Sequence, residues 1–251
     1  MSTYDSNADV QDDMAGHLVA LVSDAVGQRP GTVLEIGCGT GLLTRKLVRD
    51  MRPDRLWLND LCPSAEDFIR DIPVDDKVFV PGDAENLDFP DRLDMIVSSA
   101  AVQWFDDLES FFSKCYRALA SGGVLAFSTF GKDNLKEVSV TEGVGLDYYD
   151  RDRLVSMLGD RFEVIVAEES CVRLTFSSPL DVIRHLKETG VTGLGKEKWT
   201  KGRLLAFSHE YEERYGCGNS VPLTYNPIWI IAKKAFLIWI MCFLSVESTQ
   251  A

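Results

Sequence analysis

"VLEIGCGTG", residues 33–41, is a short apolar run containing Glu35 that continues into a loop with three alternating glycines. An apolar run of this length before a glycine is typical of a buried strand. The stretch that follows, "GLLTRKLVRD" at 41–50, carries its apolar residues at helical spacing. Glycine loops between a strand and a helix usually bind phosphate through amides at the helix start. The carboxylate of Glu35 would repel a phosphate, so the sequence raises the question of which ligand this loop binds.

Strands and helices continue to alternate up to residue 130. Four further apolar runs predict strands: "RLWLND" (55–60), "KVFVPGD" (77–83), "LDMIVSSA" (93–100) and "GVLAFSTF" (123–130). Helical patterns lie between them at "PSAEDFIRDI" (63–72) and "DLESFFSKCYRALA" (107–120). Strands that alternate with helices of about ten residues indicate βαβ units. We therefore predict an α/β fold with a doubly wound, mostly parallel sheet.

The pattern changes after residue 130. The sequence predicts a helix at 150–160, one long strand at 162–176, two helices at 178–190 and 201–215, and a closing strand at 223–234. Two of these helices fall before the last strand, so we predict a helical insertion on the substrate side at about residues 177–221. Residues 1–234 are expected to form a single domain, with its cofactor half at about residues 30–130.

Composition and charge restrict the possible functions. The chain has 251 residues and a net charge of −13. Nucleic-acid binding needs a basic surface, so this charge argues against a nucleic-acid partner. The six cysteines form no C-x-x-C pair, which favours a reduced, cytoplasmic protein without a zinc site. We expect no metal and a monomer.

Neither end of the sequence predicts a membrane segment. The start is acidic and polar, unlike a signal peptide. At the other end, Lys233 and Lys234 interrupt a very apolar stretch. The uninterrupted apolar part, residues 235–244, is about half of the ~20 residues that span a bilayer. For the tail at 235–251 we favour a short packed helix or no function over a membrane anchor.

Three classes of ligand compete for the glycine loop. A P-loop is excluded because no G-K-[ST] follows the glycines. A dinucleotide-binding loop has the spacing G-x-G-x-x-G, whereas this loop has G-x-G-x-G. S-adenosylmethionine carries an ammonium and a sulfonium group and no phosphate, so it fits the carboxylate of Glu35 best. The alternative is an ordinary nucleotide-binding fold whose acidic residues are only solvated strand ends.

Further candidate cofactor residues follow the predicted strands. Asp60 ends the second strand, where an acidic residue can accept hydrogen bonds from both ribose hydroxyls. Asp83 and Ala84 follow the third strand and would meet the adenine, although Asp83 is also in position to cap a turn. "SSAAVQWF" at 98–105 follows the fourth strand and lines the same crevice. The predicted cofactor-binding set is Glu35, Gly37, Gly39, Gly41, Asp60, Leu61, Asp83, Ala84 and Ser99.

Over about residues 30–130, the motifs "LEIGCGTG", "ND", "GDAENLDF" and "GGVLAFSTF" resemble the class I S-adenosylmethionine-dependent methyltransferases. The opening "STYDSNADVQDDMAGHL" and the blocks "SPLDVIRHLKETGVTGL" and "VPLTYNPIWIIAKK" resemble, more narrowly, the malonyl-acyl-carrier-protein O-methyltransferases of biotin synthesis. This second resemblance spans about residues 2–234. The chain departs from that family at Asn226, where a histidine often follows the tyrosine, and in the tail after Lys234.

The resemblance implies a seven-stranded, Rossmann-like sheet and a specific reaction. The free carboxyl of a malonyl thioester, carried by acyl carrier protein or coenzyme A, would be methylated to its ester. Charge agrees with an acidic carrier as partner: between Arg173 and Arg203, seven basic residues stand against three acidic ones. A local basic patch can steer an acidic partner, although a solvated helix face explains the same charges. Another small carboxylic acid or a quinone precursor stays open as acceptor, as does a binding module without turnover.

A malonyl carboxylate is already ionised at neutral pH, so it needs no general base to attack a methyl group. This agrees with the sequence, in which we find no catalytic His or Cys constellation. A cation should hold the second carboxylate oxygen, and arginine suits this because it makes a two-pronged contact. We expect His17, His185 and His209 on the surface or on helix faces. The candidates for acceptor contacts are Arg184, Arg203 and Arg173, with Tyr4 and Trp199 closing over the methyl group unless they serve packing alone.

Overall fold

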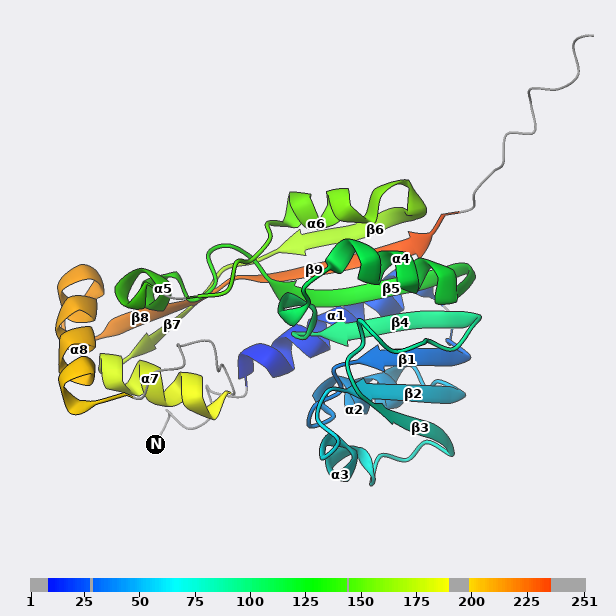
Figure 1. The fold of residues 1–251 in the computed structure, drawn as a ribbon, viewed down its shortest axis with the longest axis horizontal. Helices are drawn as coiled ribbons and strands as arrows, with labels where there is room; N and C mark the ends of the chain where they lie inside the picture. The colour runs from blue at the N-terminus through cyan, green and yellow to red at the C-terminus, as the bar shows by residue number, and fades with distance from the viewer. Residues whose placement is uncertain (1–8, 28, 144, 190–198, 236–251) are drawn as a thin grey trace, which may run out of the picture.

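A seven-stranded sheet forms the centre of the molecule. The computed structural model describes residues 9–27, 29–143, 145–189 and 199–235. Its main sheet has the strand order β3-β2-β1-β4-β5-β9-β6 (Figure 1). The strands are β1 (Thr32–Ile36), β2 (Arg55–Asp60), β3 (Asp76–Pro81), β4 (Leu93–Ser99), β5 (Leu119–Phe130), β6 (Phe162–Glu169) and β9 (Pro227–Lys234). Strands β1 to β5 pair in parallel, whereas β9 runs antiparallel between β5 and β6. The predicted doubly wound, mostly parallel α/β fold is confirmed.

Helices cover both faces of this sheet. The helical elements associated with the main sheet are α1 (Asp9–Val26), α2 (Leu42–Asp50), α3 (Ala65–Ile69), η1 (Val102–Trp104), α4 (Leu108–Ala118), α6 (Arg151–Leu158) and η2 (Gly159–Arg161). Val33 of β1 packs into the core that contains α1 and α2. Its neighbours Leu34 and Ile36 pack into the core that contains α4 and α6. Because β1 is buried on both faces, apolar residues of the strand point to both of them, as is typical of a central parallel strand; Glu35 is the one charged residue within it.

Helix α1 is an element that the sequence analysis did not predict. The start of this helix is acidic, but Met14, Leu18 and Val22 follow one another at a spacing of four residues and form an apolar stripe. All three side chains are buried in the core. The helix crosses the sheet beneath β5 and β9, and the indole of Trp229 on β9 donates a hydrogen bond to the Met14 carbonyl at 3.0 Å.

Two segments predicted as single strands are each divided between two sheets. The prediction of one strand at 162–176 is wrong, because β6 ends at Glu169 and the next residues form β7 (Val172–Phe176). The prediction of one strand at 223–234 is also wrong, because β8 (Val221–Tyr225) ends before β9 begins. Strands β7 and β8 pair with each other in a separate two-stranded sheet. Each break has a local signal that the strand predictions leave out: Glu168, Glu169 and Ser170 are consecutive polar residues, and Asn226-Pro227 is a dipeptide typical of turns.

Asn226 occupies the corner between the two sheets. Its side-chain amide donates to Glu169 Oε1 at 3.0 Å and to the Ser170 carbonyl at 2.8 Å, where β6 ends. Its side-chain oxygen accepts from the Asp133 amide at 3.1 Å, in the loop after β5. A Cβ atom at Gly131 would lie 2.4 Å from that oxygen, so the corner needs glycine there. The residue at which the chain departs from the family pattern is therefore a fully bonded structural residue.

Three helices surround the small sheet: α5 (Lys136–Glu142), α7 (Pro179–Glu188) and α8 (Lys201–Tyr215). Helices α7 and α8 lie between β7 and β8 in the sequence, within the predicted insertion at 177–221. Figure 1 shows these helices and the small sheet beyond the carboxyl ends of the parallel strands. Glu137 of α5 is buried and accepts from the Thr224 amide at 3.0 Å and from its hydroxyl at 2.5 Å, which joins α5 to β8.

His185 lies on helix α7, which agrees with the second of the two expected positions, a surface or a helix face. It is buried, at 2% exposed, and its Nε2 lies 2.8 Å from the hydroxyl of Tyr225. Burial lowers the pKa of His185 and raises that of Tyr225, so both stay neutral near pH 7. The pair links α7 to β8 inside the small subdomain, the part of the chain formed by β7, β8, α5, α7 and α8. Across the described part of the chain, no helix combines the length and apolarity needed to cross a bilayer.

Candidate active site at the carboxyl edge of the sheet

The glycine loop uses its own amides to hold itself against β2. The amides of Gly37 and Cys38 both donate to the Asn59 carbonyl at 2.9 Å. The Gly39 amide donates to Asp60 Oδ2 at 2.8 Å, and the Gly41 amide donates to the Cys38 carbonyl at 2.8 Å. A phosphate-binding loop keeps such amides free to face the anion. This loop is therefore poorly suited to a phosphate, in agreement with the sequence.

The three positions of the loop require glycine for different structural reasons. All have positive φ, at 73°, 51° and 82° for Gly37, Gly39 and Gly41, a region that favours glycine. A Cβ atom at Gly37 would lie 2.4 Å from Ala101 Cβ, and one at Gly41 would lie 3.2 Å from Ile72. A Cβ atom at Gly39 would meet nothing within 4 Å. Only Gly39 thus has open space beside it, and a ligand lying on the loop would fill that space.

Glu35 is a buried carboxylate without a partner. It is 1% exposed, and neither of its oxygens has a hydrogen-bond partner in the described structure. Burial raises the pKa of Glu35 to about 8. Thr44 on α2 opposes part of the rise, although no hydrogen bond of normal geometry joins the two side chains, and the nearby carboxylate of Asp60 adds to it. A carboxylate with so raised a pKa at the sheet edge is typical of a functional site.

Asp60 ends β2 and supports two loops at once. Its Oδ2 accepts from the Gly39 amide, and its Oδ1 accepts from the Cys62 amide at 2.8 Å. Each carboxylate oxygen has two acceptor sites, so each can still accept one hydroxyl. The next residue, Leu61, exposes 74% of its surface and places an apolar side chain next to this carboxylate.

The remaining predicted cofactor residues lie after β3 and at the end of β4. Asp83 accepts from the Glu85 amide at 2.9 Å and from the Asn86 side chain at 2.5 Å, so it does close a turn. Ala84 is buried, and its carbonyl accepts from Lys114 at 2.8 Å. Ser99 lies at the end of β4, and its hydroxyl is 2.8 Å from that of Ser128 on β5. The sheet brings all of these residues to the carboxyl ends of β1 to β4, where open α/β sheets bind ligands.

The turn η1 joins the glycine loop to a pocket. Ala101, just before η1, faces Gly37, and Ala100 adopts a φ of 53° that is uncommon outside glycine. The Gln103 amide donates to the Ala100 carbonyl at 2.7 Å, and its oxygen accepts from Thr129 at 3.3 Å. These bonds hold the Gln103 side chain between β4 and β5.

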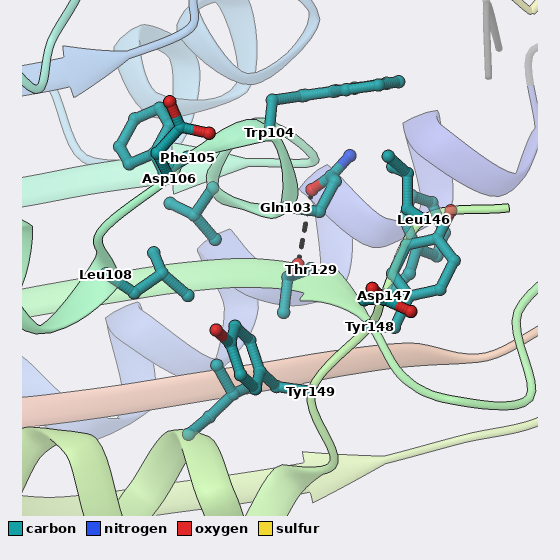
Figure 2. A pocket seen from close by; sticks show the side chains of 13 residues that line it. Gln103, Trp104, Phe105, Asp106, Leu108, Thr129, Leu146, Asp147, Tyr148 and Tyr149 are labelled. Carbon is teal, nitrogen blue, oxygen red and sulfur yellow. Dashed lines mark hydrogen bonds between the residues drawn. The ribbon is translucent and has the colours of Figure 1, made fainter.

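A pocket of about 350 Å³ opens beside η1. Figure 2 shows the Gln103–Thr129 pair at its centre, with side chains of the η1–α4 segment on one side and of the loop before α6 on the other. The lining residues are Val102, Gln103, Trp104, Phe105, Asp106, Leu108, Thr129, Phe130, Leu146, Asp147, Tyr148, Tyr149 and Leu154. The sequence analysis quoted the first half of this lining in "SSAAVQWF" but missed the half from the loop at 146–149. A signal was present in the adjacent aromatic residues of "LDYYD".

The predicted acceptor residues lie on the small subdomain, apart from the cofactor residues. Arg184 on α7 is 66% exposed and pairs with Asp181 at 2.7 Å. Arg203 on α8 is partly buried, pairs with Glu142 at 2.6 Å and lies over the ring of Trp199 at 4.7 Å. Arg173 is exposed on β7. Tyr4 lies outside the described residues. Within the described ranges, no group of three or more His, Cys, Asp and Glu residues could hold a metal ion.

Replacing Glu35 with Gln should change how stability depends on pH. In the folded chain without ligand Glu35 keeps its proton up to about pH 8, whereas the unfolded chain loses it near 4.5. Between these values the folded state holds the extra proton, so this group lowers the free energy of unfolding as pH rises, by at most about 1.4 kcal/mol per pH unit. We expect Glu35→Gln to lack this loss, so urea unfolding should favour the variant increasingly from about pH 5 to pH 8. If the stability of Glu35→Gln and that of the parent depend on pH in the same way, the assignment is contradicted.

Comparison with known proteins agrees with this geometry. The profile of the family described as "Methyltransferase domain" matches residues 34–127, which include the glycine loop and β2 to β4. The structure of a Haemonchus contortus phosphoethanolamine N-methyltransferase, solved with S-adenosylhomocysteine, matches 88% of this chain and 52% of its own, at 17% identity and a TM-score of 0.55. That likeness shows the fold.

Two curated relatives match nearly the whole chain. A malonyl-[acyl-carrier protein] O-methyltransferase of Bacteroides thetaiotaomicron is 42% identical over 248 residues, covering 93% of this chain and 94% of the relative. One of Bacteroides helcogenes is 39% identical over 259 residues, with the same coverage of each chain. Identity at this level over both full lengths shows that the chain belongs to the malonyl-[acyl-carrier protein] O-methyltransferase family.

Proposed function

We propose that this chain transfers the methyl group of S-adenosylmethionine to the free carboxyl of a malonyl thioester on acyl carrier protein, an early step of biotin synthesis. Coenzyme A is the alternative carrier of the same thioester. The observation that carries the proposal is the unpartnered carboxylate of Glu35 beside a loop whose amides are already used. This combination favours a cationic ligand over a phosphate, and the names of the relatives supply the acceptor.

The residues at the sheet edge fit this cofactor. Glu35 keeps its proton up to about pH 8 in the chain without ligand. We assign it to the ammonium end of the methionine moiety, where a nearby cation would favour its ionised form. Asp60 retains one acceptor site on each oxygen for the two ribose hydroxyls, and Leu61 supplies an apolar surface next to them. Gly39 leaves space for the ligand to lie on the backbone. We assign further contacts at the adenine and at the methyl group to Asp83, Ala84 and Ser99, with Gly37 and Gly41 shaping the loop.

When bound, S-adenosylmethionine would supply an electrophilic methyl group. A malonyl carboxylate oxygen would form the bond to this methyl carbon as the carbon–sulfur bond breaks, which gives the methyl ester and leaves the sulfur as a neutral thioether. No proton moves, because the malonyl carboxylate is ionised near pH 7. The chain therefore has to orient the acceptor and exclude water from its charged group. We assign the orientation to Arg184 or Arg203 and the closure over the methyl group to Trp199 and Tyr4.

We assign cofactor binding and acceptor binding to different parts of the chain. We propose a single methyltransferase domain over residues 1–234, whose half at about 30–130 binds the cofactor and whose insertion at about 177–221 binds the acceptor. The net charge of −13 disfavours nucleic acid, and the basic stretch from Arg173 to Arg203 suits an acidic carrier protein. The proposed form is a cytoplasmic monomer without a membrane contact, and we assign no role to residues 235–251.

Gly39→Ala should weaken cofactor binding without a matching loss of stability. Alanine at this φ is strained by about 1 kcal/mol, but its Cβ would meet no protein atom and would occupy the space assigned to the ligand. Gly27→Ala is the matched control, because Gly27 has a φ of 60° and equally open surroundings in the loop after α1. Calorimetric titration of S-adenosylmethionine should show at least roughly tenfold weaker binding for Gly39→Ala alone. If Gly39→Ala and Gly27→Ala bind S-adenosylmethionine with equal affinity, the assignment of the ligand to the space over Gly39 is wrong.

An acceptor assay tests the reaction itself. We expect label from methyl-labelled S-adenosylmethionine to appear on malonyl-acyl-carrier protein in a form that mild base releases, as for a methyl ester. The same carrier with an acetyl group, which has no free carboxyl, is the control and should stay unlabelled. If label appears on free malonate, an aconitate-type acid or a quinone precursor and none appears on the carrier, the assignment of the malonyl carrier as methyl acceptor is wrong. Absence of any heat on titrating S-adenosylmethionine would reduce the chain to a binding module for another ligand.

The two candidate arginines should respond differently to removal. Arg184 makes one exposed pair within its own helix, so Arg184→Ala should lower kcat/KM for the malonyl carrier by roughly tenfold and leave thermal stability and cofactor affinity unchanged. Arg203→Ala leaves Glu142, whose side chain is 8% exposed, without this partner, so it should lower stability as well. Arg214→Ala on the far end of α8, which also breaks an exposed pair, is the control. If Arg184→Ala behaves like Arg214→Ala in the carrier assay, Arg184 does not hold the acceptor.

A further inference from the structure

The pocket beside η1 has an unusual charge for a site next to an anionic acceptor. None of the thirteen residues that line it is lysine, arginine or histidine, and two of them, Asp106 and Asp147, are acidic. Both carboxylates belong to exposed residues at the rim. An anionic malonyl carboxylate in this pocket would face like charges and no cation, so the pocket is electrostatically unsuited to the reacting end of the acceptor.

Its position nevertheless ties it to the reaction. Ala101, which packs on Gly37 of the glycine loop, directly precedes the η1 residues that line the pocket. The floor includes Thr129 and Phe130 at the carboxyl end of β5, beside the β4 end that carries Ser99. The pocket thus opens along the same sheet edge as the proposed cofactor site, on the side of η1.

Its polar groups suit amides. Gln103 uses one amide hydrogen on the Ala100 carbonyl and keeps the second one. The Tyr149 side chain is 40% exposed and brings a hydroxyl that can donate or accept. Aromatic and aliphatic side chains, Trp104, Phe105 and Leu146 among them, supply apolar contact between these groups (Figure 2). A volume of about 350 Å³ lies within the range of small-molecule sites.

We propose that this pocket binds the pantetheine arm through which the malonyl group is attached to its carrier. The pantetheine itself is uncharged, alternates amides with short apolar segments, and ends in the thioester, so it matches the uncharged lining. The phosphate that joins it to the carrier is anionic and must lie outside the rim, away from Asp106 and Asp147. The inference rests on the proposed function, because a thioester acceptor is required for an arm to be present. It divides acceptor recognition in two: the carboxylate end meets cations elsewhere, and the arm meets the η1 pocket.

Truncated acceptors test the proposal. Malonyl-pantetheine carries the whole uncharged arm, whereas malonyl-N-acetylcysteamine carries the thioester and a single amide. We expect the parent protein to methylate both, with KM lower for malonyl-pantetheine. Leu146→Trp, which fills the pocket from a half-buried loop position, should raise KM for malonyl-pantetheine by roughly tenfold and leave kcat/KM for malonyl-N-acetylcysteamine unchanged. Ile165→Trp, at an isoleucine of β6 that is 42% exposed and outside both the pocket and the insertion, is the control and should change neither value.

A second variant guards against a folding defect. Tyr149→Ala opens the wall instead of filling it and should also raise KM for malonyl-pantetheine selectively, while calorimetric affinity for S-adenosylmethionine stays at the parent value in both variants. Equal losses on both acceptors, or no loss on either, would overturn the arm assignment. If the parent methylates malonyl-acyl-carrier protein but neither truncated thioester, the arm assignment fails; if it does not methylate the carrier either, the proposed function itself fails. If it methylates both with equal KM, only the pocket assignment fails.

Discussion

The loop after β1 is constrained by its own hydrogen bonds, and the ligand chemistry of the site depends on that constraint. The amides of Gly37 and Cys38 are held by the Asn59 carbonyl and that of Gly39 by Asp60. Those amides are therefore occupied before any ligand arrives. What the site then offers a ligand is a buried carboxylate without a partner and open space over Gly39. Both features favour a cationic ligand that lies on the backbone, and they account for an acid placed where a phosphate loop would have none.

The sequence predicts those parts of the fold that depend on a single pattern, the spacing of apolar residues along the chain. Central parallel strands such as β1 are buried on both faces, so they are read directly from continuous apolar runs. The same pattern fails at 162–176 and 223–234, because apolar residues resume soon after each break. The polar run at 168–170 and the turn dipeptide Asn226-Pro227 mark the strand ends only weakly. The corner is held by the side chain of Asn226, which satisfies backbone and side-chain groups from two segments that are far from it in the sequence, at Asp133 and at Glu169–Ser170. Long-range hydrogen bonding of this kind has no local signature.

The sequence predicted the cofactor part of the candidate site, because its residues directly follow the parallel strands and the strand order therefore fixes where they lie. Residues after β1, β2, β3 and β4 must converge, because parallel strands end at one edge of the sheet. Even there, Asp83 also closes its own turn and Asp60 also braces the loop, roles that spacing alone does not separate. The pocket half escaped prediction because Leu146 to Tyr149 come from an irregular loop. Their approach to η1 depends on tertiary packing rather than on a repeating pattern.

The proposed division of acceptor recognition has a consequence for the end of the reaction cycle. Methylation changes only the carboxylate end: an anion that a guanidinium can hold becomes a neutral ester, while the arm is chemically unchanged. If the same surface bound both ends, product and substrate would differ little in affinity. With cations on the small subdomain and an uncharged pocket beside η1, the charged contact is lost when the ester forms, and only the arm contact remains. Interactions that differ between substrate and product promote release without weakening initial recognition. In this proposal, a pocket without cations would admit the carrier arm, and the arginines alone would distinguish the acid from the ester.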